Sequence, residues 1–156
     1  MMTTCGLNAL DYQVQQAQSL SSETWVSGPK RPTQYPVKWL KDKTGSGPLA
    51  GILAALVALE SGYITVLPID TPLVSPGVLL KLRQSLSANI IAFEDQPLVG
   101  RWYKSEQFFL EQALVLGKFD VVPYIESRPH RWLGDSNLEN LNTQQEWQEF
   151  WQSQPS

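Results

Sequence analysis

Two consecutive apolar segments place the strongest constraint on how this chain can fold. Residues 49–59 carry almost no polar face, so we predict a helix that is buried on several sides. Pro48 suits its first position, and Gly62 is expected to act as its C-terminal cap. Residues 63–69 are then apolar without alternation, which is typical of a strand covered on both faces. The sequence therefore predicts a buried helix that leads into a central parallel strand.

Helical and strand patterns alternate along the rest of the chain. Apolar spacing and turn signals predict helices over 9–20, 48–59, 76–86, 105–116 and 143–152, and strands over 24–27, 37–40, 63–69, 90–93, 98–103 and 120–125. Such alternation is typical of an α/β fold with a mainly parallel sheet. Because the chain has 156 residues and shows no repeat or linker, we predict one domain over residues 1–156.

Charge and composition disfavour several classes of function. The net charge of −3 argues against binding of duplex nucleic acid, which needs many Lys and Arg side chains on its phosphates. Small anionic ligands remain compatible, because a helix N-terminus or a metal can hold a phosphate. The longest apolar stretch, residues 48–59, is much shorter than the roughly 20 residues that span a bilayer. With one cysteine and no signal segment, the chain is expected to work in the cytoplasm, away from membranes.

An aspartate follows the predicted central strand directly. Asp70 stands in L-P-I-D-T-P-L, just past the end of that strand, where open parallel sheets bind their ligands. Pro68 and Pro72 stiffen the backbone on both sides of its carboxylate. A carboxylate held in this way suits Mg²⁺, although Asp70 could instead cap a turn. Asp42 follows the strand predicted over 37–40 and could share this site, the alternative being a solvated loop residue.

A glycine-rich loop enters the apolar helix. It reads G-S-G-P-L-A-G-I from Gly45 to Ile52, and its glycines would let the backbone approach a ligand beside the free N–H groups of the helix start. Gly51 costs the helix about 1 kcal/mol relative to Ala, so we expect another group to pack against it. The alternative is a tight loop with a close contact between helix and strand. The pattern matches neither a P-loop nor a Rossmann fingerprint.

These motifs together resemble a known family. The G-P-L-A-G-I helix start at 47–52 comes about 20 residues before P-x-D-x-P-L at 68–73, and N-x-N-T-x-x-E follows at 140–146. Their order and spacing are similar to those of the molybdenum-cofactor guanylyltransferases, over nearly the whole chain. The resemblance implies a three-layer, Rossmann-like nucleotidyltransferase fold.

The resemblance also implies an activity and a set of site residues. Members of this family join GMP from GTP to the phosphate of molybdopterin, with Mg²⁺ as cofactor, and release pyrophosphate. Asp70 matches their Mg²⁺-binding catalytic aspartate, and Asp42 matches an aspartate that contacts the nucleotide. Ser27 falls near the position of a nucleotide-binding Asn, and Gly45 and Gly47 belong to the loop expected to contact the nucleotide. Proteins that mature molybdoenzymes are further expected partners.

The sequence departs from the family in two places. Nothing in residues 1–20 resembles the family's N-terminal loop L-A-G-G-x-S-x-R-M-G-x-D-K, which cradles the triphosphate. The first strand of the sheet is therefore expected to be missing, which would leave two neighbouring strands with unpaired backbone groups. We expect coding sequence for that loop upstream of Met1. Gln96 replaces a His that is common in the family near the pterin.

Two alternatives to guanylyl transfer remain open at this stage. One is a non-catalytic protein that binds a nucleotide or the cofactor after losing the phosphate loop. The other is a nucleotidyltransferase that uses CTP or a sugar phosphate, because much of the loop that would discriminate the base is missing here.

Overall fold

A computed structural model describes residues 9–18, 23–27, 35, 37–40, 47–68, 81–82 and 88–134. Two of the predicted site residues, Ser27 and Gly47, lie within these ranges. The others, Asp42, Gly45 and Asp70, lie outside the described residues. The predicted helix over 143–152, the motif at 140–146 and most of the predicted helix over 76–86 also lie outside them.

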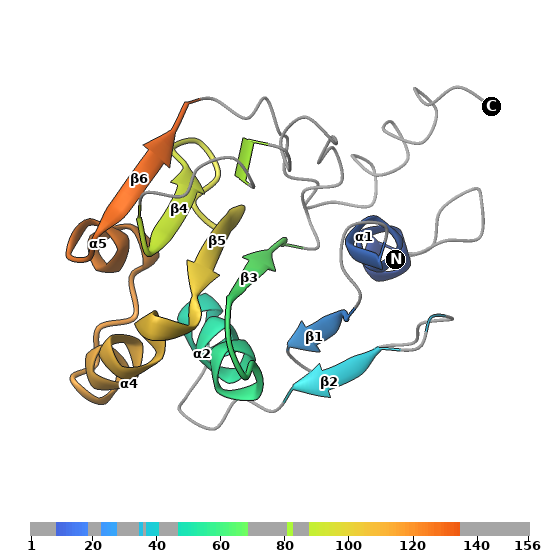
Figure 1. The fold of residues 1–156 in the computed structure, drawn as a ribbon, viewed down its shortest axis with the longest axis horizontal. Helices are drawn as coiled ribbons and strands as arrows, with labels where there is room; N and C mark the ends of the chain where they lie inside the picture. Colours follow the sequence, from blue (N-terminus) through green and yellow to red (C-terminus); the bar gives the residue numbers. More distant parts are fainter. Residues whose placement is uncertain are drawn as a thin grey trace.

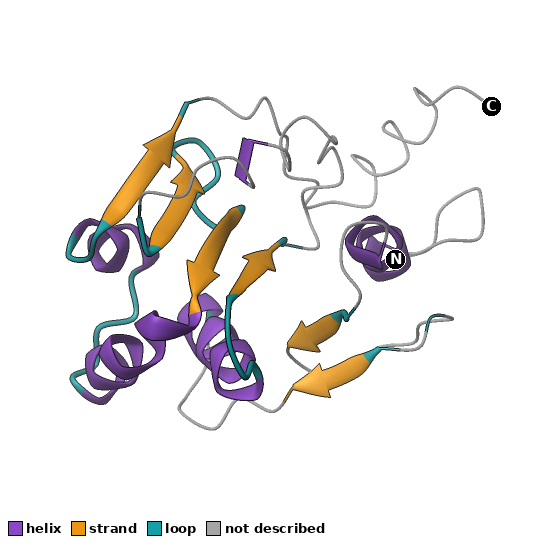
Figure 2. Ribbon diagram, viewed as in Figure 1, coloured by secondary structure: helices purple, strands orange, loops and turns teal. Residues whose placement is uncertain are grey.

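The described part of the chain mixes helices and strands throughout (Figures 1 and 2). Its helices are α1 (Ala9–Gln18), α2 (Pro48–Ala58), the 3₁₀ helix η1 (Lys104–Glu106), α4 (Gln107–Val115) and α5 (Val121–Glu126). Its strands are β1 (Trp25–Ser27), β2 (Lys38–Leu40), β3 (Tyr63–Val66), β4 (Ile90–Phe93), β5 (Gly100–Tyr103) and β6 (His130–Leu133). The predicted α/β class is confirmed.

The strands form two sheets that both contact α2. Four strands pair in the order β3-β5-β4-β6, and β1 pairs with β2. The pairs β1/β2 and β4/β6 are parallel, whereas β5 is antiparallel to both β3 and β4. Because β3, β4 and β6 run in one direction, the expected mainly parallel sheet is supported in part. Among the described strands, β1 and β3 each have an open side, and α2 packs against both of them.

The strand after α2 differs from the central parallel strand that its apolar run predicted. In the described sheet, β3 lies at an edge and its partner β5 is antiparallel. Its burial alternates: Ile64 and Val66 are half-buried, whereas Tyr63 and Thr65 are exposed. The apolar run therefore did not show whether one face of the strand or both faces are buried. A Tyr counts as apolar in the sequence whether its ring is buried or exposed, and Tyr63 is exposed.

Two further elements differ from their predictions. Residues 120–125 were predicted as a strand, but α5 forms there and the strand comes later, as β6. A short apolar run fits either state, and Pro123 is tolerated because it lies in the first turn of the helix. Helix α2 is capped at Leu59 rather than at Gly62, whose φ of 87° instead turns the chain into β3.

The core consists of two apolar clusters on opposite faces of the four-stranded sheet. Ile90 and Ala92 of β4 belong to the cluster that contains the buried residues of α2 and α4. Ile91 and Phe93 belong to the other cluster, together with Leu82 and Val99. This alternation follows from the two-residue period of a strand. β4 is therefore buried on both faces.

Candidate functional site

The candidate site begins at the first turn of α2. Gly47 precedes the helix with φ 97° and ψ 174°, a conformation that residues with a side chain rarely adopt. Pro48 takes the first helical position, as predicted, and Gly47 and Pro48 are both exposed. The first N–H groups of a helix have no partner within it, and together with the helix dipole they favour an anion. The exposed start of α2 can therefore receive a negatively charged ligand.

A close contact joins this first turn to the end of β1. A Cβ atom added to Gly51 would lie 2.5 Å from Ser27 Oγ and 3.2 Å from Ser27 Cβ. The expectation that another group packs against Gly51 is therefore confirmed, and that group is the Ser27 side chain. The glycine lets α2 approach β1 closely, so a packing role for Gly51 is established. The same contact places the exposed Ser27 beside the helix start.

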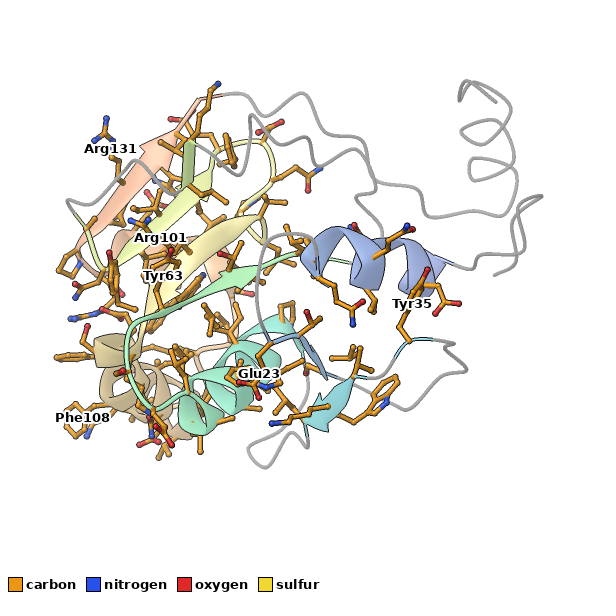
Figure 3. The ribbon with its side chains drawn as sticks, turned by 45° about the vertical axis from the view of Figure 1, so that its right-hand side comes forward. Glu23, Tyr35, Tyr63, Arg101, Phe108 and Arg131 are labelled. Carbon is orange, nitrogen blue, oxygen red and sulfur yellow. The ribbon has the colours of Figure 1, made fainter. Side chains whose placement is uncertain are left out.

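Three chain segments reach this edge of the fold. Ser27 and Leu40 are register partners, so β1 and β2 end together, and Asp42 follows Leu40 by two residues. The 11 residues of α2 rise about 16 Å, and β3 then runs back alongside the helix (Figure 3). The C-terminal end of β3 therefore comes back toward the first turn of α2. Asp70 follows β3 by four residues in the sequence.

Helix α1 contacts the end of β3 through a polar residue that the sequence did not single out. Gln13 is 4% exposed, and its side-chain amide Nε2 donates a hydrogen bond of 2.5 Å to the carbonyl oxygen of Pro68. Only the apolar spacing of α1 was visible in the sequence. The partner of Gln13 lies 55 residues away, so local periodicity gave no signal for this contact.

A buried charge cluster elsewhere has a structural role. The carboxylate of Glu106 is fully buried and accepts hydrogen bonds from Arg128 Nε at 3.0 Å, Tyr124 Oη at 3.0 Å and Asn89 Nδ2 at 3.1 Å. Burial, followed by the nearby Glu106 carboxylate, raises the pKa of the Tyr124 hydroxyl. The hydrogen bonds to Glu106 also raise the pKa of Arg128. Because these groups satisfy one another, the cluster is a packing element and not a ligand site.

The described residues do not assemble a metal centre by themselves. They contain no group of three or more His, Cys, Asp or Glu side chains that could hold an ion. Mg²⁺ needs only one or two protein carboxylates, because phosphate and water complete its shell. The hydroxyl of Ser27 and the helix start supply polar groups at this edge. Carboxylates there would come from Asp42 and Asp70, which lie outside the described ranges. Those ranges also hold no helix long and apolar enough to cross a bilayer.

Comparison with known proteins places these features in a family. Residues 1–103 match the MobA-like NTP transferase domain. A protein of Bacillus velezensis described as a probable molybdenum cofactor guanylyltransferase is 30% identical over 117 residues. That match covers 66% of this chain and 58% of the Bacillus protein, so the chain spans less than two thirds of this relative's length.

Two solved structures share the fold. Molybdopterin-guanine dinucleotide biosynthesis protein A from Archaeoglobus fulgidus superposes with a TM-score of 0.68 at 23% identity, covering 94% of this chain and 85% of that one. A protein from Aquifex aeolicus superposes with a TM-score of 0.73 at 17% identity, covering 85% and 78%. At these identities the likeness establishes the fold.

Proposed function

We propose, because the chain belongs to the MobA-like NTP transferase family, that it transfers GMP from GTP to the phosphate of molybdopterin and releases pyrophosphate. The observation that carries this proposal is the exposed, glycine-led start of α2, held against Ser27 at the end of β1. The described function of the Bacillus relative supports the choice of guanylyl transfer. In the sequence, β1 ends at Ser27, and Asp42 and Asp70 follow shortly after β2 and β3.

We assign the nucleotide to the edge where β1 and β2 end and α2 begins. Ser27 and the backbone of Gly47 would contact it directly, and Gly45 and Asp42 would complete the contact from the intervening loop. The free N–H groups at the start of α2 suit an electron-rich part of the nucleotide. We propose that molybdopterin binds at the same edge, on the side of the strands that follow β3 in the sequence.

The proposed transfer needs no covalent intermediate with the protein, and it depends on neutralising the charge of the phosphates. An oxygen of the molybdopterin phosphate attacks the α-phosphorus of GTP, and the bond from that phosphorus to the bridging oxygen of pyrophosphate breaks. Such transfers depend mainly on positioning and electrostatic stabilisation. We propose Asp70 as the ligand of Mg²⁺, which when bound would offset the charge on the phosphates. Ser27 and the start of α2 would hold the nucleotide in place for this attack.

A turnover assay tests this proposal. The full natural protein is given GTP, Mg²⁺ and molybdopterin, and formation of the dinucleotide and pyrophosphate is followed. Asp70→Asn is expected to lower the rate by about 100-fold or more, because losing a metal ligand removes several kcal/mol of charge stabilisation. Asp120→Asn is the matched control, because Asp120 is exposed and precedes α5, and it should retain the activity.

The same assay separates the alternatives. A rate with CTP that exceeds the rate with GTP would redirect the proposal to a cytidylyl transferase. Binding of GTP without turnover in the full protein would indicate a non-catalytic binding protein. Equal activity of Asp70→Asn and the wild type would reject the assigned metal ligand.

A further inference from the structure

Helix α1 buries polar side chains beside the proposed site. Asp11, Gln13 and Val14 are 5%, 4% and 3% exposed, so this short helix buries two polar side chains as well as an apolar one. Burying an amide is costly unless it makes hydrogen bonds. The Nε2 group of Gln13 meets this requirement by donating to the carbonyl oxygen of Pro68, 55 residues away. The contact therefore links α1 to a part of the chain that is distant in sequence.

The carbonyl of Pro68 lies just after the last paired residue of β3. The register between β3 and β5 ends at Val66 and Gly100, two residues before Pro68. Pro68 has no N–H group, so its carbonyl is its only backbone group that can form a hydrogen bond. Gln13 thus holds the backbone where the strand pairing has stopped, on the way to Asp70.

From this geometry we infer that Gln13 is a positioning residue for the segment that carries Asp70. The inference rests on the proposed function, in which Asp70 holds Mg²⁺. Pro68 lies two residues before Asp70 in the sequence, so the carbonyl that Gln13 holds is close to the start of this segment. In this role Gln13 acts through the Pro68 carbonyl rather than as a catalytic residue.

Two variants of the full natural protein separate positioning from folding. Gln13→Glu keeps the shape of the side chain, but its carboxylate cannot donate to a carbonyl until it is protonated. Gln13→Met removes the donor and leaves an adaptable apolar side chain, so it keeps the fold testable if the buried charge is not tolerated. Gln15→Glu is the matched control, because Gln15 is exposed on the same helix.

The first readout is the Mg²⁺ concentration that gives half-maximal guanylyl transfer at pH 7.5. We expect it to rise about tenfold in Gln13→Glu and Gln13→Met, the effect of losing one buried hydrogen bond. The defect of Gln13→Glu should shrink at pH 5.5 as its carboxyl group becomes protonated, whereas that of Gln13→Met should not. A purely structural role would lower the active fraction without moving the Mg²⁺ midpoint.

The second readout does not require activity. Amide hydrogen exchange over residues 69–75 is expected to accelerate in both Gln13 variants and to stay at the wild-type rate in Gln15→Glu. Midpoints within twofold of the control, with unchanged exchange, would overturn the positioning role. If the wild type performs no Mg²⁺-dependent transfer, the proposed function fails, and the exchange measurement alone still decides whether Gln13 anchors this segment.

Discussion

At the scale of single residues, the Glu106 carboxylate is a fully buried charge held by several side chains. A buried charge is costly unless it is paired and hydrogen-bonded. Arg128 provides the pairing, and its guanidinium also lies 3.5 Å from the centre of the Phe109 ring. Tyr124 and Asn89 donate further hydrogen bonds to the carboxylate, so η1, α5 and the start of β4 are held together through one side chain.

Removing the charge of Glu106 should destabilise the protein strongly. Glu106→Gln leaves the largely buried Arg128 without its counter-ion, and breaking a buried pair in this way costs about 3–5 kcal/mol. Urea unfolding measures the change. Glu126→Gln, at an exposed position of α5, is the control and should change the free energy of unfolding by less than about 0.5 kcal/mol. Equal losses in the two variants would show that Glu106 does not hold this network together.

Tyr124 should make the stability fall in alkaline solution. Its pKa is raised in the folded state, chiefly by burial and then by the Glu106 carboxylate. The folded state therefore holds the phenolic proton more tightly than the unfolded state. That contribution is fully present below the ordinary Tyr pKa of about 10 and is lost as the pH rises above it. Melting temperatures from pH 8 to 11 should fall more steeply in the wild type than in Tyr124→Phe, and parallel curves would contradict this account.

At the scale of elements, the packing of α2 on β1 depends on a glycine. Alanine at position 51 should favour the helix by about 1 kcal/mol if nothing opposed it. Here the added Cβ would meet Ser27, whose Oγ can rotate away but whose Cβ, at 3.2 Å, cannot. The clash with Ser27 should therefore lower the stability of an alanine variant at position 51, whereas the helix propensity of alanine should raise it.

A double-mutant cycle separates these two effects. Gly51→Ala alone is expected to lower the free energy of unfolding by about 1–2 kcal/mol, because overpacking in a tight contact is costly. In a Ser27→Gly background the same change should become neutral or stabilising, since the clash is gone. Denaturant unfolding of the four proteins gives the coupling energy. An unchanged effect of Gly51→Ala in the two backgrounds would rule out Ser27 as the obstacle.

Elements that show a clear apolar periodicity, or a glycine or proline at a boundary, could be predicted from the sequence. Features that depend on residues far away in the sequence could not. Pro48 and the apolar run after it predicted α2. The spacing of apolar and polar residues predicted α1. The strand predicted over 120–125 was wrong, because a few apolar residues around a proline fit a strand or a helix. Among the predicted site residues, Gly47 came from the glycine-rich loop and Ser27 from the family resemblance. The role of Gln13 required knowing where Pro68 lies in space.

At the scale of the whole molecule, α2 is the element that joins the two sheets. It packs against β1, β2 and β3, and α4 covers another of its sides. The proposed nucleotide site lies at the N-terminal end of this helix, where Gly51 packs against Ser27 of β1. A ligand bound there would contact the start of α2 and the end of β1. Such a ligand would stabilise the folded state by mass action, in proportion to the logarithm of its concentration.

The location of the nucleotide is the central claim, and amide hydrogen exchange of the full natural protein with saturating GTP and Mg²⁺ tests it most directly. We predict slower exchange at Leu49 and Ala50, whose amides precede the first hydrogen bond of α2, from Gly51 to Gly47, and would face the ligand, and unchanged exchange at residues 121–126 of α5. Unchanged exchange at the start of α2 under conditions where GTP is bound would contradict the account.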